Sequence, residues 1–141
     1  MTSIQRWLLW TSTALALVSG LGYAAMRYLL VGDDPFSAYH HPLQPWALAT
    51  HVIGAPVLLF VLGWFWGNHV VPKLARGRPE GRGSGLFLVG LTAVMTLSAY
   101  VAQSVAAPPA RTALAWIHGL SGTLFVILLV AHFLRGRRRA E

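Results

Sequence analysis

Four long apolar stretches follow one another along the chain, at residues of about 7–30, 46–71, 86–105 and 112–134. Each holds at least the roughly 20 consecutive apolar residues that an α-helix needs to cross the hydrocarbon core of a bilayer. The segments between them are rich in proline, glycine or charge, which is typical of turns outside a membrane. The pattern predicts an all-α protein, a transmembrane four-helix bundle that forms a single membrane domain over residues 1–141.

Prolines and glycines mark the expected interruptions of these helices. Pro56 lies inside the second stretch and predicts a kink there, and Pro72 is expected to end that helix. The basic run KLARGRPEGRGSG that follows predicts a long turn before the third span. The run AAPPA at residues 106–110 predicts the break before the fourth span.

Composition supports the membrane class and limits the chemistry. The chain is 55% hydrophobic and 11% charged, whereas soluble domains carry about 25% charged residues. Cysteine is absent, which excludes disulfides, iron–sulfur clusters, thiolate zinc sites and the covalent attachment of c-type haem. A cofactor must therefore be held without a covalent bond or through histidine.

Lysines and arginines are distributed unequally between the two ends of the predicted spans. Arg27 and Arg111 fall on one side together with Asp33 and Asp34, and nine others fall on the opposite side: Arg6, Lys73, Arg76, Arg78, Arg82, Arg135, Arg137, Arg138 and Arg139. Because cytoplasmic loops carry an excess of basic residues, we expect both termini in the cytoplasm. This topology accounts for the net charge of +7, so membrane lipid is the expected partner and nucleic acid is not.

Histidines occupy both ends of two spans. His51 and His69 are 18 residues apart in the second span, which at about 100° per residue places them on one helix face. His118 and His132 are 14 residues apart in the fourth span, about 40° out of phase. We find no convincing internal repeat beyond this two-histidine pattern. The spans contain no Asp, Glu or Lys, which argues against a proton pump, since pumps use buried carboxylates.

Four imidazoles at two depths suit two haem groups. Neutral imidazole binds haem iron well, and two imidazoles on opposite faces leave no open coordination position. We expect His51 and His118 to hold an outer haem b, and His69 and His132 an inner one. The axial separations are about 27 Å and about 21 Å, within a bilayer of about 30 Å. The pattern predicts a diheme b-type cytochrome that carries electrons across the membrane.

Other residues are candidates for the haem sites because of their expected depth in the membrane. Arg27 and Arg111 lie where the propionates of an outer haem would need cations. Gly54, Gly119 and Gly122 lie near the histidines and would make room for a porphyrin, although glycine is also common at plain helix contacts in membranes.

The loop before the second span carries Tyr39, His40, His41 and Gln44. Interfacial hydrogen bonding is the first expectation for these side chains, and a share in a quinone or quinol pocket is the second. The roles of His40 and His41 stay open.

Three runs carry a resemblance to a known family: DDPFSAYHHPLQPWALATHVIGAPVLLFVLGWFWGNHVVPKL, RGSGLFLVGLTAVMTLSAYVAQ and WIHGLSGTLFVILLVAHFLRG. They resemble small four-helix bacterial membrane proteins that are similar to the cytochrome b subunits of quinol-linked formate dehydrogenases and hydrogenases. The resemblance implies b-type haem ligated from spans two and four, in a multi-pass protein of the bacterial inner membrane. It suggests electron transfer without naming the donor or the acceptor, and the candidate partners are a quinone or quinol, another redox subunit and a periplasmic cytochrome. The 14-residue step of span four is like that in larger cytochromes b, and the 18-residue step of span two departs from it.

Other functions remain open on the sequence. A single-haem protein, a non-haem membrane protein that handles copper or zinc through histidine, and a structural anchor of a respiratory complex all fit the four spans. The chain has no flavin or nicotinamide motif, so we expect an electron-transfer protein or subunit rather than a complete enzyme.

Overall fold

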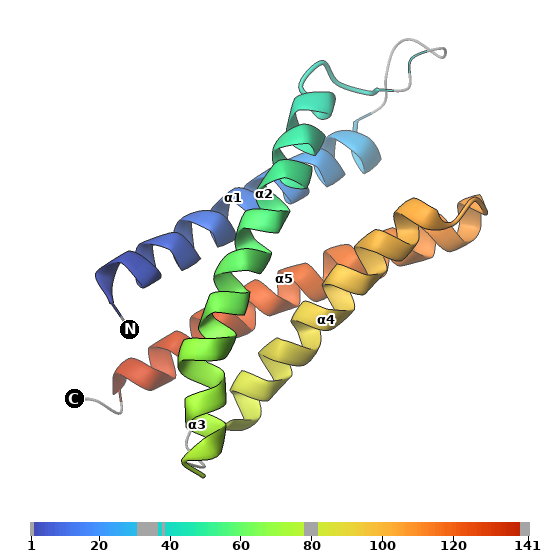
Figure 1. Ribbon diagram of the computed structural model, residues 1–141. Coiled ribbons are helices and arrows are strands. Elements are labelled where there is room, and N and C mark those ends of the chain that lie inside the picture. The colour runs from blue at the N-terminus through green and yellow to red at the C-terminus, as the bar shows by residue number, and fades with distance from the viewer. Residues whose placement is uncertain (1, 31–36, 38, 78–81, 139–141) are drawn as a thin grey trace. The chain divides into compact units, whose positions relative to one another are not determined.

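Four long helices make up most of the protein in a computed structural model, which describes residues 2–30, 37, 39–77 and 82–138. The predicted all-α class is confirmed, since the described residues form helices and no strand. The elements are α1 (Ser3–Tyr28), α2 (Gln44–Phe65), the π-helix η1 (Trp66–Val70), α3 (Val71–Ala75), α4 (Arg82–Ser104) and α5 (Pro108–Arg138) (Figure 1).

The chain divides into two compact units, Met1–Val71 and Pro72–Glu141. The first unit is a hairpin of α1 and α2, and the second is a hairpin of α4 and α5 (Figure 1). Contacts within the first hairpin run from Gly54 to Leu15 and from His51 to Ser19. Residue numbers rise along one helix as they fall along the other, so the two helices are antiparallel.

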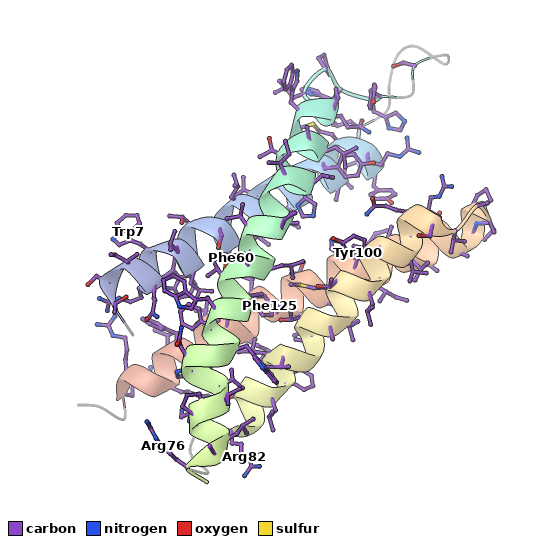
Figure 2. All side chains as sticks on the ribbon, viewed as in Figure 1. Trp7, Phe60, Arg76, Arg82, Tyr100 and Phe125 are labelled. Atoms are coloured by element: carbon purple, nitrogen blue, oxygen red, sulfur yellow. The ribbon has the colours of Figure 1, made fainter. Side chains whose placement is uncertain are left out.

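Each hairpin helix is long and apolar enough to cross a membrane. Only 22% of the most apolar window of α1, and 17% of the corresponding window in each of the other three helices, is buried. Trp7 on α1 and Phe60 on α2, labelled in Figure 2, are 71% and 75% exposed. Soluble monomers rarely expose apolar surface so continuously, so these helices point to a membrane protein.

The helices start earlier than the apolar pattern predicted. α1 begins at Ser3, α4 at Arg82 and α5 at Pro108, where the expected starts were near residues 7, 86 and 112. Hydrophobicity marks the part of a helix that crosses the bilayer core, whereas polar end turns continue the same hydrogen-bond ladder. Pro108 suits the first turn of α5 because that turn needs no donor from it.

A reciprocal cap explains the early start of α1. The main-chain N–H of Gln5 donates to Oγ1 of Thr2 at 3.2 Å, and the N–H of Thr2 donates to Oε1 of Gln5 at 2.9 Å. This capping box satisfies two donors that the helix end would otherwise leave unpaired.

The prediction that Pro72 ends the second span is wrong. The helix widens into the π turn η1 at Trp66–Val70 and then continues as α3, which includes Pro72. Pro72 has no N–H, and its ring would crowd the carbonyl four residues earlier in an unbroken α-helix. The main-chain N–H of Val71 bonds to the carbonyl of Trp66, five residues back, and α3 begins anew with Pro72 in its first turn.

Hydroxyl groups within the helices bond back to their own backbone. The hydroxyls that lie within 3.0 Å of the carbonyl four residues earlier are those of Thr11, Ser12, Ser19, Thr92, Ser98, Ser104, Ser121 and Thr123. Such bonds satisfy a polar side chain without a second helix. Among the buried hydroxyls of the described residues, that of Thr13 is the exception, since its Oγ1 has no hydrogen-bond partner there.

The close approach of α1 and α2 depends on Gly54. A Cβ atom built on Gly54 would lie 3.1 Å from Cδ2 of Leu15, so a larger side chain would force the helices apart. We predict that Gly54→Leu lowers the free energy of unfolding by about 1–3 kcal/mol relative to a matched variant, through overpacking. Thermal unfolding in detergent, followed by circular dichroism, measures the difference.

The matched variant is Gly63→Leu on the same helix, where an added Cβ meets nothing within 4 Å. Both substitutions change helix propensity equally, so equal melting temperatures for the two variants would contradict the prediction.

Candidate functional site

The His51 imidazole lies against α1, the other helix of its hairpin. Its Nδ1 is 2.9 Å from the main-chain carbonyl oxygen of Ala16 and 3.4 Å from Oγ of Ser19. Gly20 makes room for the ring, since a Cβ atom built there would lie 2.8 Å from Cε1 of His51. The main-chain carbonyl of Ala16 and the space beside Gly20, which has no side chain, therefore determine where this imidazole lies.

The acceptor fixes the tautomer of His51. A carbonyl oxygen only accepts hydrogen bonds, so the facing Nδ1 must carry a proton and donate it. A neutral imidazole with a proton on Nδ1 has its lone pair on Nε2. Metal-binding histidines typically donate the other ring N–H to a carbonyl, carboxylate or water in this way. His51 is therefore in a tautomer that suits metal binding through Nε2.

His118 repeats this arrangement in the second hairpin. Its Nδ1 lies 2.7 Å from the main-chain carbonyl oxygen of Met95 on α4. The same argument puts the proton on Nδ1 and the lone pair on Nε2. The two histidines expected at the outer level thus share one hydrogen-bond arrangement, each within its own hairpin.

A buried serine follows each acceptor carbonyl by three residues. Ser19 follows Ala16, and Ser98 follows Met95. Each serine Oγ lies 2.6–2.7 Å from the carbonyl just before the acceptor, and 3.1–3.3 Å from the acceptor itself. These serines are small enough to let the histidine-bearing helix approach, and their hydroxyls stay paired.

His132 has a different partner. Its Nδ1 lies 2.8 Å from Oγ of Ser84 in the first turn of α4, and a Cβ atom on Gly85 would lie 3.8 Å from its Cε1. A hydroxyl both donates and accepts, so this contact orients the ring without fixing its tautomer. Ser84 contacts His132 because α4 begins at Arg82, inside the stretch expected to be a turn.

His69 lies in η1, and its side chain is exposed. A π turn holds more residues than an α turn because its hydrogen bonds run from i to i+5. His69 is therefore rotated from the position that a continuous α-helix would give it, by up to about one residue or roughly 100°. The expectation that His51 and His69 share one helix face assumed a regular α-helix between them. In the structure the regular α-helix ends at Phe65, before His69.

The two arginine candidates lie at helix ends. Nε and Nη2 of Arg111 donate to the main-chain carbonyl of Val105, at 3.3 and 3.1 Å, which ties the start of α5 to the end of α4. Arg27 is exposed in the last turn of α1, where a positive charge complements the helix dipole. Their part in holding propionates stays a prediction.

The room that Gly54, Gly119 and Gly122 would make for a porphyrin stays a prediction. Gly54 faces Leu15 inside the first hairpin, and a Cβ on Gly119 or Gly122 would meet nothing within 4 Å. Gly20 lies against the ring of His51, and Gly85 lies near the ring of His132. Expected depth in the membrane did not point to Gly20, because Gly20 lies on a different helix from His51.

The loop histidines help to shape the start of α2. Oε1 of Gln44, a residue only 1% exposed, accepts the main-chain N–H of His40 at 2.9 Å. Nδ1 of His41 accepts the N–H of Leu43 at 3.1 Å. The side chains of Gln44 and His41 thus make hydrogen bonds, whereas His40 takes part through its main-chain N–H. Nδ1 of His40 is buried and has no partner among the described residues.

Pairing of His51 with His118, and of His69 with His132, would join the two hairpins and stays a prediction. Among the described residues, no group of three or more His, Cys, Asp or Glu could hold a metal ion. A haem with two axial imidazoles needs only two such residues, so this observation does not bear on it. Asp33 and Asp34 lie outside the described residues.

Comparisons with protein-family models, curated proteins and solved structures found no match to this chain.

We predict that Ser84→Ala destabilises the second hairpin, because it leaves Nδ1 of His132 without the hydroxyl at 2.8 Å. Loss of one such hydrogen bond costs about 1 kcal/mol, which thermal unfolding in detergent would detect. Ser104→Ala is the control, since the Ser104 hydroxyl bonds to Tyr100 of its own helix. If both variants lowered the melting temperature equally, the result would contradict a specific contribution of the contact between Ser84 and His132 to stability.

Proposed function

We propose that this protein is a membrane-embedded b-type cytochrome that holds two haem b groups and carries electrons across the membrane. The observation that supports the proposal most is the pair of hydrogen bonds from Nδ1 of His51 and His118 to main-chain carbonyls, at 2.9 and 2.7 Å. Haem b, when bound, supplies one-electron chemistry. The chain's own residues supply ligation, orientation and exclusion of water.

The donor chemistry of the two histidines fits haem iron. Each Nδ1–H is donated to a carbonyl, so each ring has its lone pair on Nε2 and becomes a stronger electron donor through the hydrogen bond. Two such imidazoles would hold the iron of one haem, which would then supply electron transfer rather than binding of oxygen. The resemblance to cytochrome b subunits points to the same chemistry.

The proposal includes an assembly of the two hairpins into one transmembrane four-helix bundle. In it, His51 and His118 bind the outer haem, and His69 and His132 bind the inner haem. Arg27 and Arg111 lie at the ends of α1 and α5 that the sequence places at the outer side, and they would pair with the propionates of the outer haem.

Topology follows from the distribution of charge. Both termini would lie in the cytoplasm of a bacterium, with the chain in its inner membrane, because nine of eleven basic residues fall on that side of the spans. Membrane lipid is the surrounding partner. Quinol at the loop of Tyr39, His40, His41 and Gln44, or a second redox protein such as a periplasmic cytochrome, would connect the chain to a respiratory pathway.

The inner level has weaker support, and this favours a second candidate with one haem. His69 lies in a π turn with an exposed side chain, and the hydroxyl of Ser84 does not fix the tautomer of His132. A chain with only the outer haem would be a one-electron relay near one membrane surface. Counting the haems separates the two candidates.

We predict a low-spin b-type spectrum from the detergent-purified chain, oxidised and then reduced with dithionite. A pyridine haemochrome count should give two haems per chain. His51→Ala and His69→Ala should each lower the count to about one, and each should remove a different haem, since the two residues belong to different levels.

His41→Ala is the control, because its Nδ1 accepts the N–H of Leu43 within the loop, and it should keep both haems. One haem per chain in the wild type would establish the single-haem candidate. Absence of haem absorbance from cells supplied with haem would refute the cytochrome and leave metal handling or anchoring.

We also predict that reporter proteins fused after Glu141 will show a cytoplasmic C-terminus. Alkaline phosphatase should be inactive there and green fluorescent protein should fluoresce. Active phosphatase at this position would reverse the orientation, and with it the assignment of outer and inner histidines.

A further inference from the structure

The two hairpins share a pattern of buried positions that the sequence alone did not reveal. Aligning Ser19 with Ser98 and His51 with His118 also aligns Ala16 with Met95, the two carbonyl acceptors. Three further pairs of buried residues then coincide: ten positions before the serine, and three and seven positions after the histidine. They are Leu9 with Leu88, Gly54 with Ser121, and Leu58 with Phe125.

One difference between the hairpins lies beside the imidazole. The residue after the serine is Gly20 in the first hairpin and Ala99 in the second. A Cβ atom built on Gly20 would lie 2.8 Å from Cε1 and 2.9 Å from Nδ1 of His51. Carbon atoms do not approach so closely, so a side chain at position 20 and this ring position are incompatible.

We propose that Gly20 is a positioning residue, which lets the His51 ring lie where its Nδ1 donates to Ala16. The role rests on the proposed function, because the ring so placed would be an axial ligand of the outer haem. In the second hairpin, His118 reaches Met95 at 2.7 Å with alanine at the equivalent position. The two imidazoles therefore donate to equivalent carbonyls although the neighbouring residue differs. The ring position of His51 requires glycine beside it, and that of His118 is compatible with alanine.

Two responses to a methyl group at position 20 are open to the hairpin. The ring can move away, which lengthens or bends the 2.9 Å bond to the Ala16 carbonyl. Alternatively α1 can move away, which disturbs the contact between Leu15 and Gly54. Either response uncouples the His51 ring from the carbonyl that fixes its tautomer, and changes the plane of the ring.

A double-mutant cycle in the full-length chain tests the contact. Gly20→Ala should lower the melting temperature in detergent by about 4–8 °C, as expected for an overpacked contact. In a His51→Ala background the same substitution should change it by less than about 2 °C, because the ring that the methyl group meets is gone. Gly22→Ala, where nothing lies within 4 Å, should leave the melting temperature unchanged or raise it.

Spectroscopy tests the ligand role. Nitrogen NMR of the ¹⁵N-histidine-labelled chain, prepared without haem, should lose the Nδ1–H tautomer of His51 in Gly20→Ala and keep that of His118. With haem, the low-spin electron paramagnetic resonance signal of one haem should shift in Gly20→Ala and stay unchanged in Gly22→Ala.

The outcomes separate the two proposals. A melting temperature lowered equally in both backgrounds, or a His51 tautomer unaffected by Gly20→Ala, would overturn the role of Gly20. A wild-type chain without haem would overturn the proposed function, and the cycle and the haem-free NMR spectrum would still decide whether Gly20 positions His51.

Discussion

Each hairpin depends on a hydrogen bond from a histidine ring on its second helix to a main-chain carbonyl on its first. In an apolar environment an unpaired imidazole is costly, whereas a helical carbonyl has a second lone pair that can accept without loss of the helix's own bond. The bond therefore stabilises the packing of the two helices and selects the ring nitrogen that carries the proton. One hydrogen bond thus has two effects in each hairpin: it aligns the two helices, and it leaves the lone pair of His51 or of His118 on Nε2.

The sequence predicted the helices well and their contacts poorly. Apolar stretches of at least 20 residues identified all four long helices because burial in lipid demands an apolar surface on every side. The histidines stood out for the same reason, as rare polar residues at depth. Their partners did not, because the acceptors at Ala16 and Met95 are main-chain atoms, which any residue type provides. Gly20 and Ser84 are small residues whose importance depends on which helix lies opposite, and a single sequence does not give that information.

Helix ends were a second source of error, with one physical cause. The polar turn before Leu86 and the proline at position 72 both read as interruptions, yet α4 begins at Arg82 and the second span continues to Ala75. A helix accepts polar residues where it leaves the bilayer, and it accepts proline where a π turn has already opened the ladder. This irregularity lies at His69 and has no counterpart at His132, which lies in a regular α-helix. His51 and His118 thus have matching main-chain acceptors within their own hairpins, whereas the surroundings of His69 and His132 differ.

The hydroxyls that bond back to their own helix bear on how such a chain is made. A serine whose hydroxyl is paired four residues back can enter lipid on a solitary helix, because it brings no unmet hydrogen bond with it. The carbonyls that accept from His51 and His118 lie on a neighbouring helix, so each histidine-bearing helix gains from meeting that helix early. Insertion of the two helices of a hairpin as a pair, already joined through the imidazole, would then bring that hydrogen bond into the membrane already formed.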